Sequence, residues 1–261
     1  MSGKHLAPRL ALVIAVSASS LAIAATSPGP LSHGPRSAAI SSRRASPSHL
    51  PLPQRLVELA PAADPQVLAL ALSAVRCAQA EGNGTTARRL AVIDYSRSSL
   101  QPRLWVFDLA SHKLLYRELV AHGRGSGGDI PTHFSNADGS HASSLGLFVT
   151  RDTYTGHNGY SLRMDGLEPG INDDAMARAI VMHGAPYVNA DSGRQMGRLG
   201  RSWGCPALRN AVAKPIIDVM KDGQFVFSYY PDQAWLARSA LLHCAASHTA
   251  RRDAGGNPDA S

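Results

Sequence analysis

Cys205 and His183 are the two residues whose chemistry and spacing say most about this chain. Cys205 lies in the run GRSWGCP at residues 200–206, twenty-two residues after His183. A cysteine attacks a carbonyl as its thiolate, so it needs a base, and a histidine brought close by the fold is the usual one. Glycine before the cysteine lets backbone amides approach the developing oxyanion, a role that we assign to the Gly204 and Cys205 N–H groups. The pattern predicts an acyl-transfer enzyme with Cys205 as nucleophile and His183 as general base and acid.

Arginines are frequent in the segment that leads to this cysteine, at positions Arg194, Arg198 and Arg201. Guanidinium groups bind carboxylates through two parallel hydrogen bonds. We expect Arg201, the nearest in sequence to Cys205, to bind a carboxylate of the substrate. For Arg194 and Arg198, a solvated loop explains the charge equally well.

His122 and Asp129 suggest a different chemistry, because six residues separate them and both side chains can bind zinc. Zinc D-alanyl carboxypeptidases use this spacing. Such a site also needs a later acidic residue and a histidine, and no matching element precedes His183. We therefore expect no metal and no cofactor, and we keep the zinc enzyme as an alternative.

The chain has three cysteines, Cys77, Cys205 and Cys244. In an oxidising compartment, the simplest arrangement pairs Cys77 with Cys244, joins an N-terminal helix to a C-terminal one, and leaves Cys205 free. Three unpaired thiols, with Cys77 and Cys244 as small core residues, are the competing arrangement. The sequence leaves both open.

The ends of the chain differ in composition from its centre. Residues 1–24 have a basic start, an apolar stretch interrupted by serines and a small-residue cleavage site, which is typical of a secretory signal peptide. An uncleaved anchor is the alternative, although the stretch is short for a spanning helix. We predict a Ser- and Pro-rich linker over residues 25–53, one domain over 54–245 and a disordered tail over 246–261.

This organisation predicts an exported protein of the periplasm or cell wall, without a membrane span once the signal is removed. The net charge is +7, and arginines of the predicted linker and tail supply much of the excess. No array of basic and aromatic residues indicates nucleic-acid binding. We expect a monomer.

Hydrophobic patterning predicts a mostly β domain of the α+β class, with helices at both ends. Asp64-Pro65 is typical of a helix start, Gly82 of its end, and residues 232–243 of a terminal helix. Strands are expected over residues 90–95, 104–108, 114–121, 146–150, 160–164, 179–183 and 224–229. Residues 123–144 and 191–201 are expected as loops, and residues 172–178 and 215–221 as short helices.

The segments around His183 and Cys205 resemble the catalytic domain of the L,D-transpeptidases, the YkuD-like family. The family motif is a histidine at a strand end, a variable loop and then Ser-His-Gly-Cys. Here residues 180–187 (IVMHGAPY) are followed by Ser-Trp-Gly-Cys at residues 202–205, and residues 144–148 (SLGLF) are similar to a further family strand. The resemblance spans about residues 90–229 and is closest to the branch with the motif G-R-S-W-G-C-P-A. It implies a β-sandwich or open barrel with peripheral helices.

The resemblance also implies an activity on peptidoglycan stem peptides. The cysteine would form an acyl-enzyme with a stem tetrapeptide, release D-alanine and pass the acyl group to an amine, giving a 3→3 crosslink. Carbapenems would acylate the same cysteine, and no metal would be required. Substrate contacts are expected from the residues that border the motif, namely Gly184, Tyr187, Arg201, Ser202 and Trp203.

Trp203 departs from the family pattern, because most members have a histidine at this position. A non-catalytic wall-binding protein with the same fold would follow if that histidine were essential. The family's base corresponds to His183, so we expect activity, with Trp203 altering the wall of the site or the choice of acceptor. An L,D-carboxypeptidase of the same fold, with water as acceptor, is the nearest alternative.

Overall fold

The computed structural model describes residues 50–244, so the predicted signal peptide, the tail and most of the linker lie outside the described residues. The strands are β1 (Arg89–Asp94), β2 (Leu104–Asp108), β3 (Lys113–Glu118), β4 (Val120–Ala121), β5 (Gly146–Gly156), β6 (Gly159–Gly166), β7 (Val181–Gly184), β8 (Ala207–Leu208) and β9 (Phe225–Tyr229). The helices are α1 (Leu52–Leu59), α2 (Pro65–Ala80), α3 (Ala190–Met196), α4 (Asn210–Met220) and α5 (Gln233–Arg238). Within the described residues, no helix is long and apolar enough to cross a bilayer.

The strands form one sheet that curls into a nearly closed barrel, in the order β3-β2-β1-β9-β5-β6-β7-β8-β4. Its two edge strands, β3 and β4, are consecutive in the chain, with only Leu119 between them. Arg103 binds both sides of this junction, since its amide donates to the Glu118 carbonyl and its guanidinium donates to the Val120 carbonyl. The predicted mostly β fold with an open barrel is confirmed.

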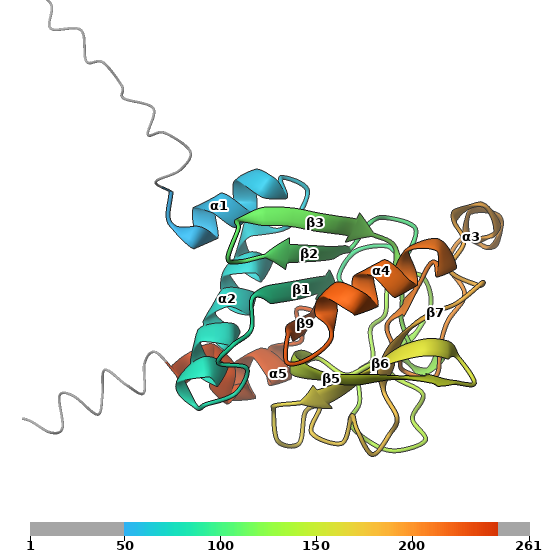
Figure 1. Ribbon diagram of the computed structural model, residues 1–261. Coiled ribbons are helices and arrows are strands. Elements are labelled where there is room, and N and C mark those ends of the chain that lie inside the picture. Colours follow the sequence, from blue (N-terminus) through green and yellow to red (C-terminus); the bar gives the residue numbers. More distant parts are fainter. Residues whose placement is uncertain (1–49, 245–261) are drawn as a thin grey trace, which may run out of the picture. The chain divides into compact units, whose positions relative to one another are not determined.

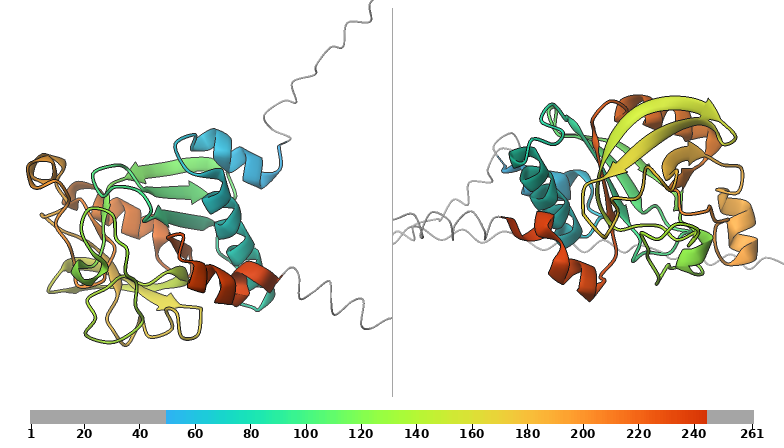
Figure 2. Two further views of the ribbon diagram at one scale, coloured as in Figure 1. Left: turned by 180° about the vertical axis from the view of Figure 1, so that it is seen from behind. Right: turned by 90° about the horizontal axis from the view of Figure 1, so that it is seen from below.

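Strands in the first half of the sheet are apolar on both faces because both faces are covered. Along β1, Leu90 and Val92 pack into one hydrophobic cluster, and Ala91 and Ile93 pack into another. Helices α2 and α5 lie over the first face and α4 over the second (Figure 1 and Figure 2). Burial on both sides explains why these strands have continuous apolar runs rather than alternation.

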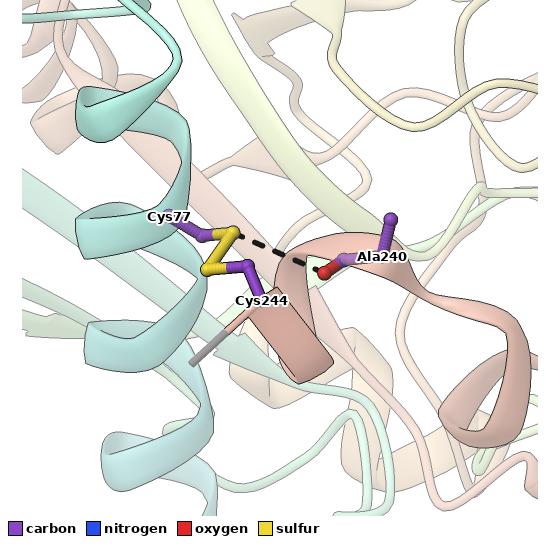
Figure 3. Close-up of a disulfide and its surroundings, with 3 residues drawn as sticks. All are labelled: Cys77, Ala240 and Cys244. Atoms are coloured by element: carbon purple, nitrogen blue, oxygen red, sulfur yellow. Dashed lines mark hydrogen bonds between the residues drawn. A yellow bond between two sulfur atoms is a disulfide. The ribbon is translucent and has the colours of Figure 1, made fainter. Parts of the chain in front are cut away.

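A disulfide between Cys77 and Cys244 joins α2 to the helical turn that follows α5 (Figure 3). The two Cα atoms are 6.0 Å apart. The Cys77 sulfur also lies 3.9 Å from the Ala240 carbonyl oxygen, a contact without a hydrogen bond because a disulfide sulfur has no proton. Cys205 is the free cysteine.

Helix α3 corrects the prediction of a loop over residues 191–201. The Asn189 side chain accepts hydrogen bonds from the amides of Asp191 and Ser192, and Gly197 ends the helix with φ +70°. An N-cap asparagine and a left-handed glycine are ordinary helix signals. The sequence analysis missed them because it gave weight to the glycine and arginine content instead.

Residues 172–178 form a series of turns in place of the predicted short helix. The Asn172 side chain explains the difference, since its amide donates to the carbonyls of Leu145 and Leu147 and its oxygen accepts from the Glu168 amide. Asparagine that bonds neighbouring backbone in this way competes with helix formation.

Several boundaries also differ. Helix α1 begins at Leu52, inside the predicted linker, and buries Leu56. Helix α4 begins at Asn210 and contains Pro215, so it starts earlier than predicted. The predicted strand over 114–121 divides at Leu119, and the terminal helix breaks after Arg238.

Candidate active site

Parallel pairing of β7 and β8 brings His183 and Cys205 together. His183 lies in β7 and pairs with Ala207 of β8, two residues after Cys205. The Val181 amide donates to Cys205 Sγ at 3.4 Å, and the thiol lies 3.7 Å from the Ala179 carbonyl, which it donates to. Cys205 is therefore held against the backbone of the strand that carries His183.

One cavity of about 310 Å³ contains most of the predicted site. Six predicted residues line it: His183, Tyr187, Arg201, Ser202, Trp203 and Cys205. Gly184 and Gly204 do not line it. A Cβ at Gly184 would lie 2.9 Å from Ala213 Cβ, so this glycine permits the close approach of α4 to β7.

His157 and Asn158 line the same cavity and were missed by the sequence analysis. They form the tip of the hairpin that joins β5 to β6. A Gly-His-Asn-Gly sequence between two runs rich in β-branched and aromatic residues is a hairpin signal. That signal predicts the turn, but only the fold places it over Cys205.

His183 is held in the tautomer that a general base needs. It is buried, and its Nδ1 lies 2.9 Å from the Gly184 carbonyl oxygen. A carbonyl only accepts, so Nδ1 carries the proton and Nε2 has a free lone pair. Burial lowers the pKa of His183, which keeps the imidazole neutral near pH 7.

Cys205 is also buried, with 8% of its surface exposed. Burial raises the pKa of the Cys205 thiol, while the Val181 amide and the Arg178 guanidinium lower it. The net direction is upward. The resting pair is therefore a neutral thiol and a neutral imidazole, so a thiolate at Cys205 requires proton transfer to a base.

Arg178 is a neighbour of Cys205 for which the sequence carries no signal. Its guanidinium is bound to the segment over residues 135–144, and the residue that follows it, Ala179, supplies the carbonyl at the Cys205 thiol. The four acceptors are the Ser135 and Ala142 carbonyls and the Ser140 and Ser144 hydroxyls. Arg178 thus ties the wall of the site to the nucleophile's surroundings and adds positive charge there.

Ser202 organises the turn that presents Cys205. Its hydroxyl donates to the Cys205 carbonyl at 2.6 Å and accepts from the Gly204 amide at 3.1 Å. Its own amide donates to the His122 carbonyl at 3.0 Å. Gly204 has φ +120°, and a Cβ there would lie 2.9 Å from the Ala142 carbonyl oxygen, so the position requires glycine.

His122 supports this turn and does not line the cavity. Arg103 Nη2 lies 2.7 Å from His122 Nδ1, and since a guanidinium only donates, Nδ1 accepts. Burial, together with the Arg103 charge, lowers the pKa of His122 to about 3.

The residues of the zinc alternative have separate partners. His122 Nδ1 is engaged by Arg103, whereas the Asp129 carboxylate accepts from the Ser99 amide and hydroxyl at 2.9 and 2.6 Å. Among residues 50–244, no group of three histidine, cysteine, aspartate or glutamate side chains is arranged to hold a metal ion.

Trp203 is 68% exposed at the mouth of the cavity. The His141 ring stacks on it with centroids 4.9 Å apart, and the Arg124 guanidinium lies 5.2 Å from its centroid. The position where most of the family has a histidine is therefore an exposed aromatic surface, with a histidine from another segment against it.

This chain belongs to the family of L,D-transpeptidase catalytic domains, whose family model matches residues 59–229. A search of curated proteins found no match.

Solved structures similar to the chain include L,D-transpeptidases and a cell-shape protein. An L,D-transpeptidase from Mycobacterium smegmatis is 14% identical, with a TM-score of 0.35 over 55% of this chain and 59% of that one. An L,D-transpeptidase from Mycobacterium tuberculosis is 15% identical, with a TM-score of 0.32 over 55% and 58%. The helical cell shape determining protein Pgp2 from Campylobacter jejuni is 14% identical, with a TM-score of 0.36 over 62% and 56%. The chain thus spans less than two thirds of each of these three structures, and family membership rests on the family model.

Proposed function

We propose that the chain is an exported L,D-transpeptidase that acts on peptidoglycan stem peptides through a covalent Cys205 intermediate. One observation carries the proposal: Cys205 shares a cavity with His183, whose Nε2 has a free lone pair. Membership of the L,D-transpeptidase catalytic domain family supports the reaction class and the substrate class.

In the first half-reaction, Cys205 Sγ attacks the carbonyl carbon that precedes the terminal D-alanine of a stem tetrapeptide. The thiol proton moves to His183 Nε2 as the sulfur–carbon bond forms, since both groups start neutral. His183 then returns this proton to the amine nitrogen of D-alanine as the carbon–nitrogen bond breaks. A thioester remains on Cys205.

The oxyanion of each tetrahedral intermediate needs an amide donor close to the sulfur. The sequence predicts this role for the Gly204 and Cys205 amides, and the Gly204 amide donates to the Ser202 hydroxyl at 3.1 Å. The Cys205 amide is the adjacent donor, and we assign the oxyanion role to it. The Gly204 amide would bind the oxyanion only if its hydrogen bond to the Ser202 hydroxyl were broken.

In the second half-reaction, an amine of another stem attacks the thioester carbon and loses a proton to His183 Nε2. The acyl group transfers, the sulfur leaves as thiolate, and the histidine returns the proton to it. With an amine on the third residue of the acceptor stem, the product is a 3→3 crosslink. Water in place of the amine gives a tripeptide, which is the carboxypeptidase reaction.

The test is incubation of the mature protein with a purified disaccharide tetrapeptide, with products followed by mass spectrometry. A crosslinked dimer that Cys205→Ala does not form supports the transpeptidase, and fragmentation of the dimer identifies the acceptor amine. Tripeptide alone indicates the carboxypeptidase. Activity that survives Cys205→Ala but not a chelator indicates zinc, and an intact protein that gives neither product nor carbapenem adduct indicates a wall-binding protein.

A further inference from the structure

Arg201 lines the Cys205 cavity, and Arg124 lies against Trp203 at its mouth; neither has a carboxylate partner in the described part of the chain. Arg201 Nη1 donates to the Gly127 carbonyl at 2.5 Å, and Arg124 donates to His141 Nδ1 at 3.0 Å. Arg198 donates to the Leu199 carbonyl. These acceptors are all neutral, so each guanidinium keeps its charge uncompensated.

Six of the other thirteen arginines in residues 50–244 form ion pairs. The pairs are Arg55–Glu58, Arg89–Asp108, Arg151–Asp165, Arg163–Asp152, Arg194–Asp191 and Arg209–Glu118. Arg194, in the same segment as Arg198 and Arg201, is among them. Seven of the other arginines also lack an ion pair, so Arg124 and Arg201 are distinguished by their position beside the cavity and not by the lack of pairing alone.

The unpaired arginines lie close enough to oppose one another. Besides its burial, the charges of Arg198 and Arg124 lower the pKa of Arg201, and Arg201 Nη1 lies 3.5 Å from the Arg124 carbonyl oxygen. The residues that line the cavity include no aspartate or glutamate. Like charges gathered without a counter-ion favour the binding of an anion.

Trp203 adds an apolar surface to this charged rim. Arg124 and His141 are hydrogen-bonded to each other and both lie against the Trp203 ring, so they form one layer beside it. The ring is nevertheless 68% exposed. Its free surface is available to the aliphatic part of a ligand whose carboxylate reaches the arginines.

We propose that Trp203, Arg124 and Arg201 form a subsite for a free carboxylate of an acidic peptide, positioned beside the bond that Cys205 attacks. The subsite selects stems with free carboxylates over stems in which the same groups are amidated. The identity of the ligand as a stem peptide rests on the proposed function, whereas the anion preference of the subsite does not.

The first test compares the alkylation of Cys205 by iodoacetate and by iodoacetamide, which differ in charge and little in size. We expect the rate with iodoacetate, divided by the rate with iodoacetamide, to fall about three- to tenfold in Arg201→Gln and in Arg124→Gln. The same ratio should fall in wild type at 0.5 M salt. Arg76→Gln, on α2 and outside the cavity, is the matched control and should keep the wild-type ratio.

Thermal melting establishes that each variant is folded, and the double variant should lower the ratio further. A ratio that stays at the wild-type value in the folded single and double variants overturns the subsite. Because this readout needs no turnover, it remains decisive even if no stem peptide reacts.

The second test measures kcat/KM for a tetrapeptide stem with free carboxylates and for its amidated form. We expect the free form to be preferred about tenfold by wild type, and the preference to shrink in Arg201→Gln and Arg124→Gln. Equal kcat/KM values for both stems in wild type would exclude selection for the carboxylate. Failure of every stem to react would instead contradict the proposed function.

Discussion

His122-Gly123 and His183-Gly184 are the same dipeptide at the ends of two strands, β4 and β7, on opposite sides of β8. Ala207 of β8 pairs with Ala121 on one side and with His183 on the other. Both histidines are buried, with 1% and 4% of their surface exposed. The sequence motif assigns His183 to the cysteine that precedes β8, and it offers His122 only as a ligand of the zinc alternative.

Their hydrogen-bond partners separate them. Arg103 donates to Nδ1 of His122, so the proton of that imidazole is on Nε2. His183 donates from Nδ1 to the Gly184 carbonyl, so its Nε2 is free to accept a proton. Burial near a strand end therefore does not make a histidine a base; the partner of the other ring nitrogen does.

The largest expected effect comes from replacing each histidine by alanine. His183→Ala should slow the acylation of Cys205 by a carbapenem about 10²–10⁴-fold with little loss of stability. His122→Ala should lower the free energy of unfolding by about 3 kcal/mol, while acylation of Cys205 in the folded fraction stays measurable. Intact-protein mass spectrometry and urea unfolding give the two readouts. If folded His122→Ala lost as much acylation of Cys205 as His183→Ala, the assignment of His183 as base and of His122 as a structural residue would be wrong.

The two glycines extend the comparison to packing. A Cβ at Gly123 would lie 2.4 Å from the His141 carbonyl oxygen and 2.7 Å from Gly204 Cα, which are backbone atoms. At Gly184 the nearest atoms belong to the side chains of Asn210 and Ala213, at 2.8 and 2.9 Å. The Asn210 side chain can turn away, although Ala213 Cβ moves only together with α4, so Gly123→Ala should cost about 3 kcal/mol of stability and Gly184→Ala about 2 kcal/mol. Urea unfolding of the two variants measures these costs. A larger loss of stability in Gly184→Ala than in Gly123→Ala would contradict this account of the packing.

Stability should fall in mild acid because His122 is held neutral. Its pKa is lowered to about 3 in the folded state, whereas an unfolded histidine titrates near 6.5, so the unfolded chain takes up the proton first. The contribution of neutral His122 to the free energy of unfolding is complete above pH 6.5 and is lost as the pH falls from 6.5 toward 3. The loss is about 2 kcal/mol between pH 7 and pH 5.

Urea unfolding at pH 7, 6 and 5 measures this loss. In His122→Gln, the fall in the free energy of unfolding between pH 7 and pH 5 should be smaller by about 2 kcal/mol. His133→Gln, at an exposed position, should show the same fall as wild type. The lowered pKa of His183 acts in the same direction. An identical slope in wild type and His122→Gln would show that His122 is not the titrating group.

The smallest effect is expected at Ser202, which connects the His122 end to the nucleophile. Ser202→Ala removes the hydroxyl bonds to the Cys205 carbonyl and the Gly204 amide, and should cost about 1 kcal/mol of stability. Acylation of Cys205 should slow by about tenfold, because the turn is held less firmly. Faster acylation would instead mean that the released Gly204 amide serves the oxyanion better than the Cys205 amide.

Local sequence signals predicted the elements with strong patterns. The Asp64-Pro65 start of α2 and the apolar runs of β1, β2 and β9 depend on neighbouring residues, and the structure has these elements at those positions. The turns over residues 172–178 were predicted wrongly because Asn172 bonds to carbonyls more than twenty residues away. Such partners leave no trace in the local pattern.

The sequence by itself determined the family and the strand-rich architecture and predicted Cys205 as the nucleophile, because a motif and its spacing are properties of the chain. It also placed Arg201, Ser202 and Trp203 near Cys205, since they adjoin it. Only the tertiary structure decided which histidine has a free Nε2, which arginines lack a carboxylate partner, and that His157 faces the same cavity. The physical reason is that charge state and tautomer depend on burial and on hydrogen-bond partners supplied by remote segments, as Arg103 is supplied to His122 across the closure of the barrel.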